Sequence, residues 1–423
     1  MKLLDQSLPC ACAVHLTAST PDPEAIGKRL LAAKCRAKGK RGKDGGWMLV
    51  ASHPMWGEAE ILYRDDAPKL PPADMLEWTP GLVHADPELL SSSRSAVLVR
   101  HAGTHGSVPA DRKAMLWFAR TVMGDQGTTA YDLQSLLFWM PDALDDELSH
   151  DAGLSTRQLY IVHAVRSEAA LAKDARHGTW MHSHGLGALG AHEFDVLDAD
   201  PQLDPSAYDA LVGALLDGAG PGDECPITLT APPAMLVDAD EFMGKAKPEW
   251  TGLRDHDEDH RAKRVVVCDP AKKRLGGLGG GGKPRPASAF RDAASVQGVA
   301  LPVAFNAVLA DRARASLPFL RRALDEFAHW DLEPIAKLKL ETDQGSHEFP
   351  WFKLHEISEN ELDATLLNEP FDIAGLNAGD RRTWPVRRLS SWAVPTPFGM
   401  LTPDALHPAR MLRQHKPSEF ARA

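Results

Sequence analysis

The stretch from Gly178 to Asp195, GTWMHSHGLGALGAHEFD, combines two histidines one residue apart with a run of glycines and a second, acidic segment. Its first part, GTWMHSH, and the segment HEFDVLDA that overlaps its end are rich in apolar and aromatic residues, which favours β-strands. The glycines between them favour a sharp turn. The sequence therefore predicts two strands joined by a tight turn near the middle of the chain.

Two of these histidines could hold a metal ion. On a strand, residues two apart share a face, so His182 and His184 could both direct a ring nitrogen at one ion. An acid of the next strand, Asp195 or Glu193, would complete the ligand set, and the sequence does not choose between the two. Zinc is the candidate ion, and no other cofactor is expected. The alternative is a pair of half-buried histidines whose ring N–H groups donate to carbonyls across the sheet.

Strand and helix patterns alternate irregularly on both sides of this stretch. Such a mixture predicts the α+β class and several domains, since 423 residues exceed one ordinary core. The expected strands are CACAVHLTAS, WMLVAS, EAEILYR, SAVLVRH, RQLYIVHAV, CPITLTA and RVVVCD. The expected helices are a segment from Pro21 to about Lys38, then RKAMLWFARTVM, YDLQSLLFWMPDAL and PSAYDALVGALLDG.

We expect four parts in the chain. Residues 1–90 would form a small α/β unit, and residues 91–270 an α+β domain that carries the histidines. Residues 271–298 are a Gly- and Pro-rich basic linker, and residues 299–410 a C-terminal domain. Gly277 to Lys283 fits the first seven positions of a phosphate-binding loop, but Pro284 stands where a hydroxyl is needed.

The composition limits the classes of function. A formal net charge of -11 argues against nucleic acid as a partner, because affinity for phosphate requires a positive surface. The basic run KCRAKGKRGK, from Lys34 to Lys43, is an exception that we interpret as the solvated end of a helix. No apolar run is long enough for a membrane span. The five scattered cysteines and the acidic start of the chain lead us to expect a cytoplasmic protein with reduced thiols.

The C-terminal part contains a helical segment, from Ala310 to Trp330, followed by short strand-like and turn-like pieces. Three features stand out there: Glu348 with Trp351 shortly after it, the segment LLNEPFDIAGLNAGDRRTWPV, and the closing Ser391-Trp392. In these residues the segment resembles the YegJ-like bacterial family, domain of unknown function 2314. The turn residues predict a small, strongly bent, barrel-like sheet capped by a helix. We expect the tryptophans to belong to its core.

The middle of the chain resembles two further groups of proteins. Trp180, His184-Gly185-Leu186 and Glu193 resemble a pattern in uncharacterised bacterial domains that accompany the YegJ-like domain. The same stretch resembles the zinc-ligand signature of JAMM metalloproteases, which implies His182, His184 and Asp195 as ligands. Gly185 and His192 stand where that signature has proline and serine, and Glu168 is the nearest upstream acid.

Two hypotheses of function follow. The first is a bacterial cytoplasmic protein that binds a protein or a small molecule, of an immunity-like or stress-related kind. The second is a metal-dependent hydrolase that uses the His-x-His site. Neither the ligand nor the biological process follows from the sequence.

Overall fold

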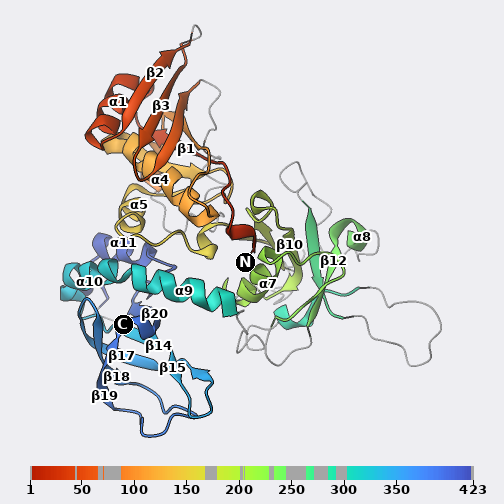
Figure 1. Cartoon of the computed structure of the whole chain (residues 1–423). Coiled ribbons are helices and arrows are strands. Elements are labelled where there is room, and N and C mark those ends of the chain that lie inside the picture. Colours follow the sequence, from red (N-terminus) through yellow and green to blue (C-terminus); the bar gives the residue numbers. More distant parts are fainter. Residues whose placement is uncertain are drawn as a thin grey trace.

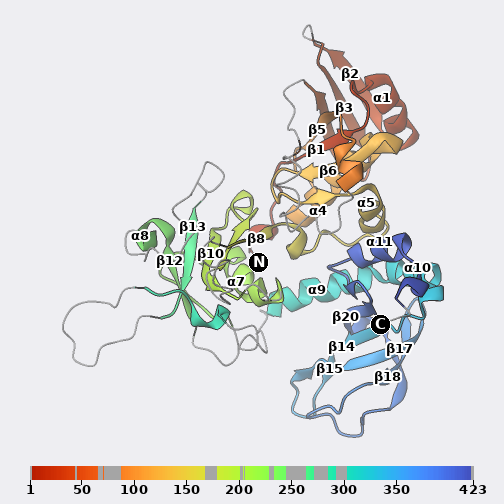
Figure 2. The ribbon, with the colours of Figure 1, turned by 180° about the vertical axis from the view of Figure 1, so that it is seen from behind.

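The computed structural model describes residues 2–42, 45–64, 70, 87–166, 179–200, 203, 205–227, 233–243, 263–270, 284–291 and 303–420. These residues form three lobes, each built on its own main sheet (Figure 1). Helices and antiparallel strands are mixed in each lobe, which confirms the α+β class. The view from behind shows the long helix α9, Val303–Ala315, between the middle lobe and the C-terminal lobe (Figure 2).

The first lobe contains a seven-stranded sheet in the order β2-β3-β4-β5-β1-β6-β7. Helices α1 and α4 contact its strands, and α3 and α5 lie near β6. Because β5 pairs with both β1 and β4, the sheet continues across the boundary predicted near residue 90. The strands are Cys10–Leu16, Arg36–Arg41, Trp47–His53, Gly57–Tyr63, Ser95–His101, Gly127–Asp132 and Phe138–Trp139, for β1 to β7. The helices are α1 Pro23–Ala32, α3 Pro87–Ser91, α4 Val108–Met123 and α5 Pro141–Glu147.

The basic run after α1 is a strand, and its interpretation as a helix end is wrong. Helix α1 begins where the Asp22 carboxylate accepts the Glu24 and Ala25 amides, and it ends at Ala32. Strand β2, Arg36–Arg41, then pairs along its length with β3 at the edge of the sheet. Charged side chains such as lysine and arginine on an edge strand disfavour its pairing with a strand of another chain.

The segment YDLQSLLFWMPDAL is also not the predicted amphipathic helix. The Asp132 carboxylate accepts the amides of Gln134 and Ser135, at 2.9 and 3.3 Å, which forms a tight turn instead of a helix. Strand β7 then returns alongside β6, and Pro141 starts the short helix α5. Local side-chain hydrogen bonds thus override the helical spacing of the apolar residues.

The middle lobe contains a six-stranded sheet in the order β11-β12-β13-β10-β9-β8. The predicted strands around both histidines are confirmed, and β10 and β13 form a parallel pair. The strands are Ile161–Arg166, Thr179–His184, Glu193–Ala199, Glu224–Cys225, Ala234–Asp238 and Arg264–Cys268, for β8 to β13. The helices are α7 Asp209–Leu216 and α8 Ala239–Met243.

The predicted linker lies largely outside the described residues, including the Gly277 to Lys283 segment. Its described part, residues 284–291, packs against the middle lobe. The Ala287 amide donates to the Val267 carbonyl at 3.1 Å, and the buried Phe290 ring stacks on Tyr208. These residues are therefore part of the middle lobe.

The C-terminal lobe contains an open six-stranded sheet in the order β19-β18-β17-β14-β20-β21. Its described edge strands do not pair with each other, so the predicted barrel-like sheet is not a closed barrel. The predicted long helix is divided into α9 and α10 at Ser316, just before Pro318. The strands are Ile335–Leu338, Leu340–Glu341, His347–Glu348, Trp351–Ile357, Glu361–Leu366, Arg381–Pro385, Leu389–Thr396 and Gly399–Leu401, for β14 to β21. The helices are α10 Leu317–Glu326 and α11 His407–Gln414.

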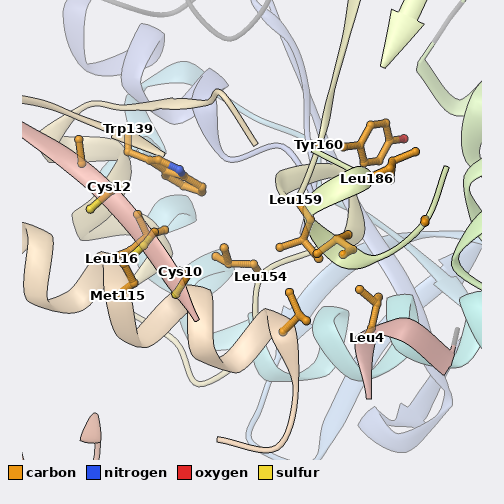
Figure 3. Packing of buried hydrophobic residues seen from close by; sticks show 14 of the residues in the cluster. Leu4, Cys10, Cys12, Met115, Leu116, Trp139, Leu154, Leu159, Tyr160 and Leu186 are labelled. Atoms are coloured by element: carbon orange, nitrogen blue, oxygen red, sulfur yellow. The ribbon is translucent and has the colours of Figure 1, made fainter. Parts of the chain in front are cut away.

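Two large hydrophobic clusters form the main cores. One runs without interruption from the first lobe into the middle lobe, and the other contains only residues 313–412. Figure 3 shows the join of the first two lobes, where Leu159 and Tyr160 lie near Leu186. Trp392 is fully buried in the C-terminal core and donates its indole N–H to Ser316 at 3.0 Å, as expected for a core tryptophan.

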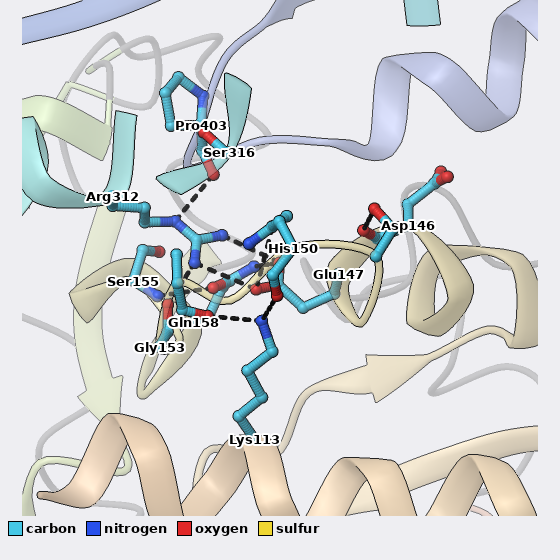
Figure 4. A network of polar contacts seen from close by, with 12 residues as sticks. Lys113, Asp146, Glu147, His150, Gly153, Ser155, Gln158, Arg312, Ser316 and Pro403 are labelled. Carbon is cyan, nitrogen blue, oxygen red and sulfur yellow. Dashed lines mark hydrogen bonds and ion pairs between the residues drawn. The ribbon is translucent and has the colours of Figure 1, made fainter. Parts of the chain in front are cut away.

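Buried charges join the C-terminal lobe to the first lobe (Figure 4). Arg312 of α9 forms two hydrogen bonds with the Glu147 carboxylate, at 3.0 and 2.9 Å, and both side chains are almost fully buried. Nearby, Arg413 of α11 binds Asp146 of α5 in the same bidentate way. Removing one partner of such a pair leaves an uncompensated buried charge. These ion pairs therefore favour the observed packing of α9 and α11 against α5.

In the part of the chain that the structure describes, no helix has the length and apolar character needed to cross a bilayer.

Candidate metal centre

Three histidines of the middle lobe converge from two neighbouring strands. Strand β8 carries His163, and strand β9 carries His182 and His184. His163 lies directly opposite His182 in the antiparallel pair, and His184 is two residues further along β9. Since cross-strand partners and residues two apart share a face of a sheet, the strand geometry alone brings the three rings together.

The ring geometry is compact. The ring centroids of His163 and His182 are 5.3 Å apart, those of His163 and His184 4.7 Å, and those of His182 and His184 4.9 Å. One nitrogen of each ring lies within 4.8 Å of a nitrogen of each other ring. Tetrahedral zinc at its usual Zn–N distance holds nitrogens about 3.3 Å apart, so the three nitrogens would draw closer together on binding one ion.

The predicted pair of histidine ligands is thus brought together, and a third histidine joins it. Sequence reasoning missed His163, although it predicted the strand RQLYIVHAV that carries this residue. The available signal was a histidine on the strand preceding the His-x-His strand. What was missing was the register, because a shift of one residue would turn His163 to the opposite face.

Trp180 covers the cluster from β9. Its ring lies 3.9 Å from the His182 ring, centroid to centroid, with the two planes 24° apart. The indole N–H donates to Asp195 Oδ1 at 2.9 Å, which fixes the orientation of the tryptophan. His182 and His184 are buried, with 2% and 8% of their surface exposed, and His163 is half-buried. The imidazoles are therefore partly desolvated, and the Trp180 ring stacks on one of them, His182.

Asp195, the predicted acidic ligand, is placed differently. Both carboxylate oxygens are bound by Arg264, with Nη2 at 2.9 Å from Oδ1 and Nε at 3.0 Å from Oδ2. The ion pair is buried, since Arg264 and Asp195 expose 2% and 0% of their side chains. Among the described residues, Asp195 is not part of the histidine group. The structure thus shows Asp195 as an anchor for Trp180 and Arg264.

Glu193, the alternative acid, organises the turn after β9. Its carboxylate accepts the Ser183 hydroxyl at 2.5 Å and the amides of Gly185 and Gly187 at 2.8 and 2.7 Å. Gly185 has φ of +112°, and a Cβ atom there would lie 2.7 Å from the Leu159 carbonyl oxygen. Glycine is therefore required where the JAMM signature has proline. Glu168 lies outside the described residues.

A second group of potential ligands, His101, His105 and Asp111, lies in the first lobe. Nδ1 of His101 accepts the Gly103 amide at 3.0 Å, and its Nε2–H donates to the Trp56 carbonyl at 3.2 Å. Burial lowers the pKa of His101, which favours this neutral form. Asp111 Oδ1 accepts two backbone amides, from Thr104 at 2.7 Å and His105 at 2.8 Å. This group is thus the hydrogen-bonding centre of the turn before α4.

Comparisons of the chain with protein-family models, with curated proteins and with solved structures give no match. The resemblance of the C-terminal segment to the YegJ-like family stays a prediction.

Proposed function

We propose that the protein is a metal-binding protein, in which His163, His182 and His184 bind one divalent transition-metal ion, with zinc as the first candidate. The observation that carries the proposal is the convergence of three imidazoles, from two adjacent strands, within 4.8 Å. Imidazole nitrogen suits zinc, copper, nickel and cobalt, whereas magnesium and calcium prefer oxygen ligands. An all-histidine set therefore selects the first group of ions.

The geometry supports metal binding better than a JAMM-type hydrolase. Three protein ligands leave one position of a tetrahedral ion for water or another ligand, as in catalytic zinc sites. A hydrolase also needs a base for that water. Asp195 is engaged by Arg264 and Trp180, and Glu193 by the turn after β9. We therefore propose a binding role, in which the ion supports the lobe or presents its open position to a ligand.

The cysteines agree with a reducing environment for such a protein. All five are free and buried, and burial raises the pKa of each thiol. Protonated, buried thiols are unreactive and behave as small apolar side chains. We propose a cytoplasmic location on this basis.

Metal analysis of protein produced without a histidine tag tests the proposal. We expect about one bound ion per chain, and a cobalt-loaded sample with the visible absorption of a tetrahedral site. His163→Ala, His182→Ala and His184→Ala should each lose the ion, whereas the exposed His355→Ala should retain it. Circular dichroism must show that the variants are folded.

Two outcomes would contradict the proposal. A wild-type protein that binds neither zinc nor cobalt would exclude the site, and so would a folded His182→Ala variant with unchanged metal content. Asp195→Asn separates the proposed ligand set from the one predicted from the sequence. If the three histidines are the ligands, folded Asp195→Asn still binds one ion per chain. If Asp195 is a ligand, this variant loses the ion.

A further inference from the structure

The loop between β18 and β19, residues 367–380, holds a phenylalanine out in solvent. Phe371 exposes 96% of its surface, more than any other large apolar residue that the structure describes. Leu367, at the start of the same loop, exposes 49%. We refer to residues 367–380 as the Phe371 loop. Its aromatic residue thus stands apart from every core of the molecule.

Hydrogen bonds fix the backbone of this loop on both sides of the phenylalanine. The Glu348 carboxylate accepts the amides of Phe371 and Asp372, at 2.9 and 2.5 Å. The Asp343 amide donates to the Asp372 carbonyl at 3.1 Å, and its carboxylate accepts the Ala374 amide at 2.9 Å. The β15–β16 hairpin therefore braces the loop, and the exposure of Phe371 is a defined feature of the fold.

Two other apolar side chains of the same loop point inward. Leu376 exposes only 3% of its surface, and Ile373 packs against the C-terminal core. The loop thus anchors two aliphatic residues and presents its aromatic one. Aromatic side chains dominate the binding energy of protein interfaces, and a loop already fixed in place loses little entropy on binding. This combination is typical of a docking residue.

The charges around Phe371 indicate the chemistry of the partner. Residues 340–349 and 367–380 together contain no lysine or arginine, and Arg382 of the adjoining strand β19 pairs with one carboxylate of the loop, Asp380, and donates to the Gly375 carbonyl. The two ranges contain six carboxylates: Glu341, Asp343, Glu348, Glu369, Asp372 and Asp380. Such a rim repels nucleic acid and anionic lipid and favours a basic protein surface. The net charge of -11 also disfavours the association of two copies through this acidic face.

We propose that the Phe371 loop is a docking site for a partner protein, in which Phe371 enters an apolar pocket rimmed by lysine or arginine. The acidic rim then steers the partner, and the phenylalanine supplies most of the affinity. This proposal is independent of the metal centre, which lies in another lobe.

Photo-crosslinking with the full chain tests the proposal. Benzoylphenylalanine is placed at position 371, and at Met55 as a control that exposes 65% of its surface. Each protein is irradiated in an extract of the cells that produce it, and the adducts are identified by mass spectrometry. The captured protein is then purified, and its affinity for wild type, Phe371→Ala and Met55→Ala is measured by calorimetry at two salt concentrations.

We expect an adduct from position 371 that position 55 does not give. Phe371→Ala should weaken binding of the purified partner by about tenfold or more, whereas Met55→Ala should leave it unchanged. Higher salt should weaken binding as well. The melting temperature of Phe371→Ala should equal that of wild type, because 96% of the surface of the phenylalanine is exposed.

Four results would overturn the proposal. The first is the absence of an adduct specific to position 371, and the second is an adduct formed only with a second copy of the chain. The third is a captured partner that binds Phe371→Ala as tightly as wild type. The fourth is Phe371-dependent binding of the full chain to phosphatidylglycerol vesicles, which would assign the loop to a membrane surface.

Discussion

The two histidine groups differ in how the fold brings their members together. His101 ends β5, His105 lies in the connection that follows, and Asp111 lies in the first turn of α4, so one continuous segment carries all three. Backbone amides bind the carboxylate and one ring of this group. His163, His182 and His184 come from two paired strands, and the His182 ring meets each of the other two edge to face. Spatial proximity of ligand-type residues is common to both. The difference shows that hydrogen bonds within one segment hold the first group together, whereas the register between two strands sets the arrangement of the second.

Loss of Asp111 should have the largest effect, because it holds the turn of the first group. Asp111→Ala removes the acceptor for the Thr104 and His105 amides at a fully buried position. We expect the free energy of unfolding to fall by about 3 kcal/mol or more, since buried donors are left without acceptors. Urea denaturation measures this change. Asp111→Asn, which keeps one acceptor oxygen, should lose less.

The same Asp111→Ala variant tests the comparison itself. If the first group is structural, the folded fraction of this variant binds as much zinc as wild type. A loss of bound metal in a folded Asp111→Ala protein would show that the two groups had been assigned the wrong way round.

Zinc should stabilise the protein only through the second group. At free zinc one hundred times the dissociation constant, a single site adds about 2.7 kcal/mol to the free energy of unfolding. We expect this gain, measured as a rise in melting temperature, to disappear in His182→Ala. His105→Ala should keep the gain, even if its starting stability is lower. Equal gains in both variants would contradict a site at His182.

In the middle lobe, the sequence predicted the features that depend on residues close together in the chain, and it missed those that depend on residues far apart. The apolar and aromatic residues of the two segments predicted β9 and β10 correctly, and residue spacing alone placed His182 and His184 on one face. The register between β8 and β9, which brings His163 into the group, depends on contacts across the sheet. The ion pair of Asp195 depends on Arg264 from β13, far away in sequence, so residue spacing alone does not reveal it.

The same distinction explains the errors in the first lobe. YDLQSLLFWMPDAL has helical spacing, but the Asp132 carboxylate binds the next two free amides and forms a turn. The basic segment Arg36–Arg41 was expected to continue α1, yet pairing with β3 makes it an edge strand. In each case a hydrogen bond that the periodicity does not encode decided the local structure.

Acid should lower the free energy of unfolding through His101 of the first group, independently of any metal ion. Burial lowers the pKa of His101, so the unfolded chain binds a proton more readily than the folded protein does. The contribution of neutral His101 is complete above the ordinary histidine pKa of about 6.5 and is lost as the pH falls below it. One proton changes the free energy of unfolding by at most about 1.4 kcal/mol per pH unit. Urea denaturation between pH 7 and 5, with chelator present, measures the slope.

His101→Gln is the matched variant for that measurement. Glutamine offers one acceptor for the Gly103 amide and one donor for the Trp56 carbonyl, but it does not titrate. We expect a shallower slope in His101→Gln than in wild type. An identical slope in the two proteins would assign the acid sensitivity to other buried histidines, such as His150, whose pKa burial lowers to about 4.

The smallest effect should come from the tryptophan that orients the second group. Trp180→Phe keeps an aromatic ring against His182 but loses the N–H that donates to Asp195. Loss of a residue that orients metal ligands typically weakens affinity by about ten- to hundredfold, and we expect no more than the lower figure here because the stacking is retained. Competition with a chromogenic chelator measures the affinity, while the stoichiometry of one ion per chain should not change. Trp180→Leu, which removes the ring, should bind more weakly than Trp180→Phe. If both variants bind zinc as tightly as wild type, Trp180 packs beside the histidines without orienting them, and the second group depends on its strands alone.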